Sequence, residues 1–175
     1  MKYQRTIAPA AARPRGRMNR RKSIALGAII ALPALSACTP TISVNAGPYA
    51  TEPVCAKVVL ALPDQVLEQE RAKTTSQATA AWGEGGAAIT FTCGVQPPAP
   101  TTEDCQSITT DVFGTDETFD WITTQDSKGF TFVSYGRTPA MMVQVPAILG
   151  TNQPTAALLD VANAVAKIEA TSSCI

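Results

Sequence analysis

Five cysteines and a complete lack of histidine decide what chemistry this chain of 175 residues can perform. Without histidine there is no Ser-His or Cys-His nucleophile pair, no imidazole proton shuttle and no His-x-x-x-His zinc site. Zinc would need all four of the later cysteines, and a catalytic cysteine would lack its usual base. We therefore expect no metal ion, no cofactor and no catalytic residue. The cysteines stand at Cys38, Cys55, Cys93, Cys105 and Cys174, without a Cys-x-x-Cys pair.

An arginine in a predicted bend is the first candidate for binding. Arg137 lies in Gly136-Arg137-Thr138-Pro139. Its planar guanidinium could bind a carboxylate or phosphate of a ligand or partner. The alternative, which we favour, is an internal ion pair that fixes the bend, with Asp120 as the candidate acid.

Large aromatic side chains are the second candidate. Trp82 and Trp121 could line a ligand groove together with Tyr135. Side chains of this size more often anchor a hydrophobic core, and we favour that interpretation.

Oxygen ligands and a Ser-Lys pair complete the candidates. Residues 109–111 and 116–117 form an acidic segment that could hold calcium, but the ordered EF-hand spacing is missing, so a solvated loop is favoured. Ser107 and Lys128 could act as nucleophile and base only if the fold brought them together. No carboxylate pair is singled out for hydrolysis.

Charge is distributed unevenly, although the formal net charge is zero. Residues 1–37 carry eight positive charges and no acid, whereas residues 38–175 carry six positive and 14 negative charges, a net charge of −8. The chain has no basic excess, which removes the usual electrostatic case for nucleic-acid binding. A basic stretch, an apolar run over 24–35 and small residues up to 37 predict a signal peptide over 1–37.

The apolar run is too short for a membrane span, although an uncleaved anchor is the alternative. Met18 would give a signal peptide of more usual length, so the true start could be there. Arg20-Arg21 leaves open whether export follows the general or the twin-arginine route.

A lipid anchor is predicted at the end of this segment. Leu35-Ser36-Ala37-Cys38 resembles the lipobox of bacterial lipoproteins. In that family the cysteine is lipidated and becomes the new N-terminus, which implies attachment to the extracytoplasmic face of the cell membrane. A diacylglyceryl group supplies the two chains that stable anchoring requires. A free Cys38 after conventional cleavage is the alternative.

The four cysteines of the exported part predict disulfides, because their number is even and the compartment is oxidising. Four cysteines allow three pairings. We favour Cys93 with Cys105, which bracket a proline-rich loop, and Cys55 with Cys174. Residues 38–54 are then a lipidated N-terminus with a short tether or edge strand, and 55–175 form one domain.

Hydrophobic periodicity predicts an α+β domain, an antiparallel sheet of about four to five strands flanked by N-terminal and C-terminal helices, with two disulfides. A helix is expected over 55–67 with a break at Pro63, followed by a polar helix over 64–76. The last helix carries an apolar stripe from Leu158 to Ile168. Strands are expected over 89–93, 105–108, 119–124, 130–135 and 141–145, with a turn at 126–129 and a short edge strand at 42–44.

An ordered series of short sequence motifs resembles the actinobacterial lipoprotein family called domain of unknown function 3515. They are the lipobox, Cys55 with Leu62-Pro63, Ala81-Trp82-Gly83, Cys93-Gly94-Val95 with Pro97, Cys105, Asp120-Trp121, Gly136-Arg137-Thr138-Pro139-Ala140, Val143-Gln144-Val145-Pro146 and Cys174. The resemblance covers nearly all of residues 40–175 and implies an exported lipoprotein. It assigns no catalytic residue.

Two functions follow as hypotheses. The first is a non-enzymatic module at the cell envelope that binds an envelope protein or a small ligand, with Arg137, Trp121 and Trp82 as candidate contacts. The second is a histidine-independent hydrolase that acts on cell-wall material. An accessory subunit of a membrane complex would share the anchor of the first.

Overall fold

The structure is a computed structural model that describes residues 41–150 and 153–174. The chain divides into two compact units, Met1–Ser36 and Ala37–Ile175. The predicted signal peptide and Cys38 lie outside the described residues, so everything below concerns the second unit.

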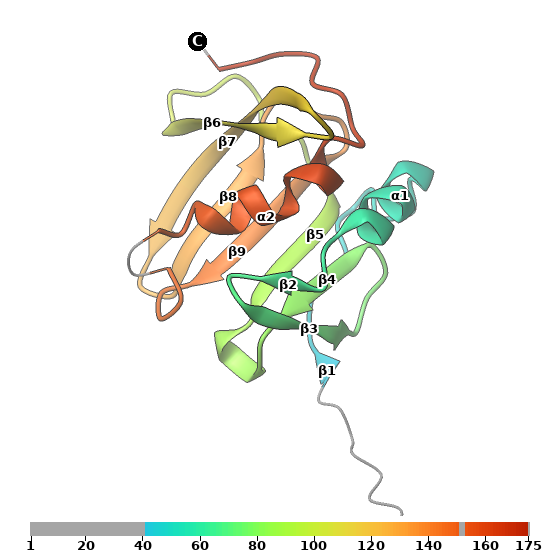
Figure 1. Cartoon of the computed structure of the whole chain (residues 1–175), viewed down its shortest axis with the longest axis vertical. Coiled ribbons are helices and arrows are strands. Elements are labelled where there is room, and N and C mark those ends of the chain that lie inside the picture. The colour runs from blue at the N-terminus through green and yellow to red at the C-terminus, as the bar shows by residue number, and fades with distance from the viewer. Residues whose placement is uncertain (1–40, 151–152, 175) are drawn as a thin grey trace, which may run out of the picture. The chain divides into compact units, whose positions relative to one another are not determined.

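One sheet dominates this unit (Figure 1). The strand order is β1-β3-β4-β5-β9-β8-β7-β6, and β2 pairs with β3 off this path. All pairs are antiparallel except β1 with β3, which is parallel. In the described residues the strands are β1 (Thr41–Ile42), β2 (Gln65–Val66), β3 (Gln69–Thr74), β4 (Thr79–Trp82), β5 (Ile89–Val95), β6 (Cys105–Val112), β7 (Thr115–Asp126), β8 (Gly129–Ser134) and β9 (Ala140–Pro146).

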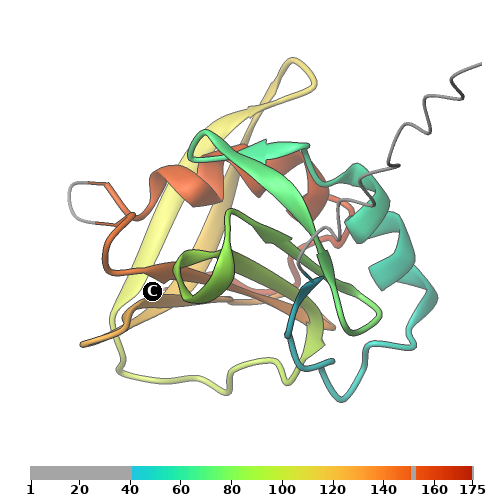
Figure 2. The ribbon, with the colours of Figure 1, turned by 90° about the horizontal axis from the view of Figure 1, so that it is seen from below.

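Two meanders meet at the centre of the sheet. Strands β3, β4 and β5 follow one another in space as in sequence. The chain then crosses to β6 at the far edge and returns through β7 and β8 to β9, which pairs with β5. The crossing segment, residues 96–104, passes on the side of the sheet opposite α2 (Figure 2). Residues far apart in sequence are therefore neighbours at the β5–β9 seam.

Two short helices contribute to the core. Helix α1 (Pro53–Ala61) has a proline in its first turn and ends before Pro63, and Arg71 donates to the carbonyls of Val59 and Leu62 at its C-terminal end, both at 3.1 Å. These charge-assisted bonds satisfy carbonyls that a helix end leaves open. Helix α2 (Ala156–Val165) lies across the strands in Figure 1. A short 3-10 turn, η1, spans Gly85–Ala87.

Both helices pack into one hydrophobic cluster with one face of the strands. Residues from α1, α2, β4, β5, β7, β8 and β9 meet there, among them Val58, Val161, Phe91, Phe132 and Val143, all fully buried. A smaller cluster on the opposite face joins Ile42 and Val44 to Ala81 and Ala88. Residues 42–44 therefore belong to the packed domain.

The expected sheet, the N-terminal and C-terminal helices and the two disulfides are present. The sheet has nine strands in the described residues instead of four to five, and the helices do not clearly flank it, because both pack into the same hydrophobic cluster. The polar helix expected over 64–76 is wrong, because this segment forms β2 and β3, joined by a tight turn at Leu67 and Glu68. Both turn residues have positive φ, 47° and 62°. Neither is glycine or asparagine, so the residue types did not indicate a hairpin turn here. Asp160 of α2 accepts a hydrogen bond from the Leu67 amide at 2.9 Å and supports this turn.

Candidate functional site

The predicted bend at 136–139 carries Arg137, whose guanidinium makes buried polar contacts within the domain. Arg137 is 2% exposed, and the peptide bond between Thr138 and Pro139 is cis. The Arg137 guanidinium donates to the carbonyl of Ile168 and, through Nη2, to Oε1 of Glu117 at 2.8 Å. It also lies 4.8 Å from the centroid of the Phe119 ring. Arg137 thus connects the end of the α2 segment to β7.

The internal ion pair favoured from the sequence is confirmed, but the suggested partner was wrong. Glu117 takes the place proposed for Asp120. Side chains alternate along β7, so Glu117 and Phe119 share the core face with Arg137, whereas Asp120 points to the opposite face. Both hydrogen bonds of the Arg137 guanidinium are made within the domain, to Ile168 and Glu117. A role of Arg137 in binding a ligand or partner stays a prediction.

Asp120 is 9% exposed and has its own partners. Its Oδ1 accepts from Ser107 Oγ at 2.5 Å, and its Oδ2 accepts from the Cys174 amide at 2.8 Å. Asp120 therefore fixes the C-terminal segment to the outer face of β7. Ser107 is paired with Asp120 of the neighbouring strand β7. Lys128 follows the end of β7 at Asp126, which is six residues, or about 20 Å, along the strand from Asp120. The structure does not bring Ser107 and Lys128 together.

The favoured disulfide pairing is wrong. The disulfides are Cys55–Cys93 and Cys105–Cys174, with Cα–Cα distances of 5.5 and 6.5 Å. Cys93 lies on the core side of β5, beneath α1, whereas Cys105 lies on the opposite face of β6. Three strands separate β5 from β6, a spacing of about 19 Å. The proline-rich loop between them is a crossover, so proximity in sequence misled the prediction.

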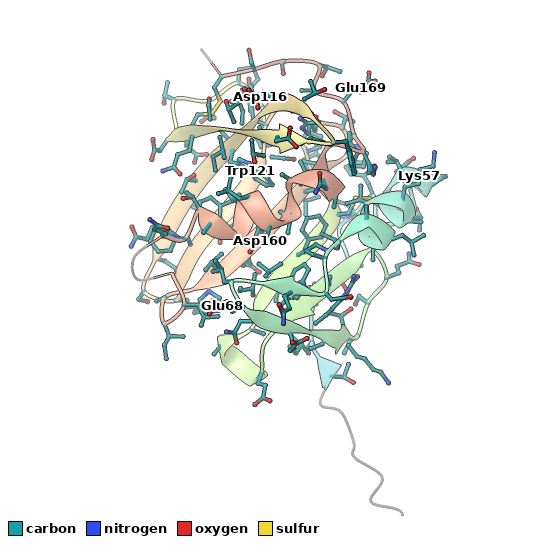
Figure 3. All side chains as sticks on the ribbon, in the orientation of Figure 1. Lys57, Glu68, Asp116, Trp121, Asp160 and Glu169 are labelled. Atoms are coloured by element: carbon teal, nitrogen blue, oxygen red, sulfur yellow. A yellow bond between two sulfur atoms is a disulfide. The ribbon has the colours of Figure 1, made fainter. Side chains whose placement is uncertain are left out.

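The two tryptophans lie in the core, as the favoured interpretation held. Trp82 is fully buried, and its Nε1 donates to the Pro63 carbonyl at 3.0 Å. Trp121 is 1% exposed and lies beside α2 (Figure 3). Among the described residues its Nε1 has no hydrogen-bond partner. Tyr135 instead lines a surface cavity beside the Cys105–Cys174 disulfide, so the three aromatic side chains do not form a common groove.

The acidic segment is a hairpin and not a converging set of ligands. Asp111 and Asp116 face each other across β6 and β7, while Glu117 points to Arg137. Asp111 Oδ1 accepts from the Gly114 amide at 3.1 Å. The tip carries Phe113, whose side chain is 75% exposed.

Two hollows of the surface had no clear signal in the sequence. The first, of about 580 Å³, lies beside α1 and is lined by Ala56, Val59 and Leu60 together with residues 50–53 and 77–78. Leu60 is 85% exposed there. The available hint was that residues 53–61 carry apolar side chains on more than one side of the helix, with Lys57 as the one charged residue.

The second hollow, of about 490 Å³, is lined by the Cys105–Cys174 disulfide. It lies on the outer face of the sheet, where β6 begins. The sequence could not place it, because it depends on the pairing of Cys174 with Cys105.

These features define a disulfide-linked domain of one sheet and two short helices. The chain belongs to the family described as protein of unknown function (DUF3515), whose model matches residues 23–173. No curated protein and no solved structure matches the chain. Within the described residues, no helix combines the length and the apolar character needed to span a membrane.

Proposed function

We propose that the chain is an exported lipoprotein, held at the extracytoplasmic face of the cell membrane by lipid on Cys38, and that it serves there as a non-enzymatic binding module. The observation that carries this proposal is the state of the cysteines. Four of the five are joined in two disulfides, which favours an oxidising compartment. The fifth, Cys38, is the one in the lipobox sequence.

The start of the sheet supports a position close to the lipid. Strand β1 begins at Thr41, three residues after Cys38, so an extended chain spans at most about 10 Å between them. Ile42 and Val44 are already buried in the domain. A domain tethered so closely presents a restricted set of surfaces to other envelope proteins.

The outer side of α1 is the surface we propose for binding. Leu60 is 85% exposed and lies beside the hollow of about 580 Å³, with Ala56 and Val59 also in its lining. Arg71 holds the C-terminal end of the helix in place, so this apolar surface is rigid. An apolar segment of another envelope protein is the occupant that suits it, because burying Leu60 would remove a large apolar side chain from water.

Substitution of Cys38 tests the anchor. Cells expressing the wild type or Cys38→Ala would be labelled with a fatty-acid analogue and then separated into membrane and soluble fractions. We expect the variant to lose the label and leave the membrane fraction, whereas Ser36→Ala keeps both because alanine remains a small residue. Equal labelling and membrane association of all three proteins would refute the anchor.

Substitution of Leu60 tests the binding surface. Crosslinking in live cells should recover a reproducible partner with the wild type and lose it with Leu60→Asp. Ile148→Asp is the matched control, because Ile148 is also exposed, at 72%, and lies elsewhere on the domain. Loss of the partner with both variants, or with neither, would contradict the assignment to α1.

A further inference from the structure

The two disulfides differ in their access to solvent. Cys55 and Cys93 are fully buried in the core cluster. Cys105 and Cys174 are partly exposed and line the cavity of about 490 Å³. Thiol–disulfide exchange requires a thiolate to reach a sulfur atom, so access alone separates the two bonds. The folded domain offers the second bond to a reductant and protects the first.

The surroundings of the accessible disulfide are acidic. A carboxylate oxygen of Asp120 and the two sulfur atoms lie within 4.8 Å of one another. Glu103 and Asp104, both exposed, lie on the cavity lining, which includes no lysine or arginine among the described residues. Negative charge at this position repels an approaching thiolate and disfavours the thiolate that must leave. Exchange is therefore slow unless the attacking molecule brings positive charge.

The disulfide also fixes a defined segment. Residues 169–174, which we call the C-terminal strap, run from the end of the α2 region toward β6 (Figure 1). Thr171 donates its amide to the Gly136 carbonyl at 2.7 Å, Ala170 forms a bridge with Arg137, and the Cys174 amide binds Asp120. Thr171 also donates its Oγ1 hydroxyl to the Gly136 carbonyl at 3.0 Å. The Cys105–Cys174 disulfide adds a covalent bond between the strap and the sheet.

We propose that Cys105–Cys174 is a thiol–disulfide exchange site for an exported dithiol protein whose reactive cysteine is flanked by basic side chains. A thiolate of that protein attacks one sulfur, forms a mixed disulfide and releases the other sulfur as a thiolate, which takes up a proton. The second thiol of the reductant then closes its own disulfide and releases the remaining cysteine as a thiol. Two electrons pass from the dithiol to the disulfide, and the strap loses its covalent tie.

Selective reduction is the first test. The purified, oxidised full chain would be treated with a dithiol under native conditions, quenched with an alkylating reagent at intervals and digested for mass spectrometry. We expect Cys105 and Cys174 to be alkylated at least ten times faster than Cys55 and Cys93. Equal rates, or a rate for Cys105 and Cys174 that rises only with denaturant, would overturn the proposal because both show that reduction requires global unfolding.

The charge of the attacking thiol is the second test. Cysteamine, 2-mercaptoethanol and 3-mercaptopropionate supply a positive, a neutral and a negative neighbour for the same reacting group. Each rate is divided by the rate of that thiol with a neutral small-molecule disulfide. We expect a ratio of about fivefold or more between the positive and negative thiols at low salt, which falls toward one in about 1 M salt.

A matched pair of double variants separates the local charge from the charge of the whole domain. Glu103→Gln with Asp104→Asn removes two charges at the cavity, and Glu68→Gln with Glu84→Gln removes two exposed charges elsewhere. The first pair should reduce the preference for the positive thiol, and the second should leave it unchanged. No preference in the wild type, or the same change with both pairs, would overturn the cationic reductant.

Discussion

Nη2 of Arg137 lies 2.8 Å from Oε1 of Glu117, and this ion pair joins the bend after β8 to β7 beneath the end of the α2 region. The two partners are unequal. The side chain of Arg137 is 2% exposed, whereas that of Glu117 is 35% exposed. Removal of the acid therefore leaves a positive charge in a buried position, where a lost partner is most costly.

We expect Glu117→Ala to lower the free energy of unfolding by about 3 kcal/mol, because it leaves the buried charge of Arg137 without its acid. Urea unfolding followed by circular dichroism measures the change. Asp116→Ala is the control: this residue is exposed, lies opposite Asp111 and loses a like-charge contact. Its stability should stay the same or rise by a few tenths of a kcal/mol. Equal losses in the two variants would show that the ion pair contributes little.

The disulfide connectivity predicts the products of a non-reducing digest. One peptide should join Cys55 to Cys93 and another should join Cys105 to Cys174. A peptide joining Cys93 to Cys105 would contradict the structure. The paired substitution Cys55→Ala with Cys93→Ala opens a loop with a sequence separation of 38 residues, and we expect a loss of about 4 kcal/mol from the chain-entropy term.

The strands with alternating patterns could be predicted from the sequence, and those without them could not. Ile89, Phe91 and Cys93 alternate with threonines, and the turn at 126–129 carries Asp126, whose Oδ1 accepts from two following amides. In contrast, β3 reads as polar and helix-compatible, because it lies near the edge of the sheet, between β4 and the short strands β1 and β2, and none of its residues is buried. Pairing partners supply that information, and they lie elsewhere in the chain.

The candidate site shows the same division. The sequence predicted an internal ion pair of Arg137 that fixes the bend at 136–139, with Asp120 as the candidate acid. It could not choose Glu117 over Asp120, since that choice depends on which face of β7 meets the bend. The disulfide pairing failed for a topological reason: the crossover from β5 to β6 takes Cys105 across the sheet, away from Cys93.

The tip of the β6–β7 hairpin offers a test of local strain. Phe113 and Gly114 form the two-residue turn with φ values of 53° and 89°, a conformation that favours Asn-Gly. We expect Phe113→Asn to raise the free energy of unfolding by about 0.5–1 kcal/mol, because asparagine tolerates positive φ. The Phe113 ring also lies 4.8 Å from Nζ of Lys167.

Phe113→Leu separates the backbone strain from the contact between the ring and Lys167. It removes the ring but keeps a side chain for which positive φ is unfavourable. It should be slightly less stable than the wild type, by an amount equal to the cation–π contact. Differential scanning calorimetry of the three proteins gives the comparison. If Phe113→Asn were less stable than Phe113→Leu, backbone strain at the tip would be unimportant.

Gly136 tests how the C-terminal strap is seated. Its φ is +72°, and a Cβ atom built there would overlap the carbonyl oxygen of Ser172 in the strap. Gly85 also has a positive φ, +53°, but nothing lies within 4 Å of its Cβ position, so it is the matched control. Gly85→Ala should cost about 1 kcal/mol, the price of the backbone conformation alone. Gly136→Ala should cost clearly more, because the strap must move as well.

Hydrogen exchange distinguishes a displaced strap from a general loss of stability. In Gly136→Ala the amides of Thr171 and Cys174, which bind the Gly136 carbonyl and Asp120, should exchange faster, while the amides of β5 and β9 keep their protection relative to the new global stability. Gly85→Ala should leave the Thr171 and Cys174 amides as protected as in the wild type. Uniform acceleration across the domain in Gly136→Ala would mean that the strap and the sheet unfold as one unit, and that the close packing of Ser172 on Gly136 belongs to the core and not to a separable segment.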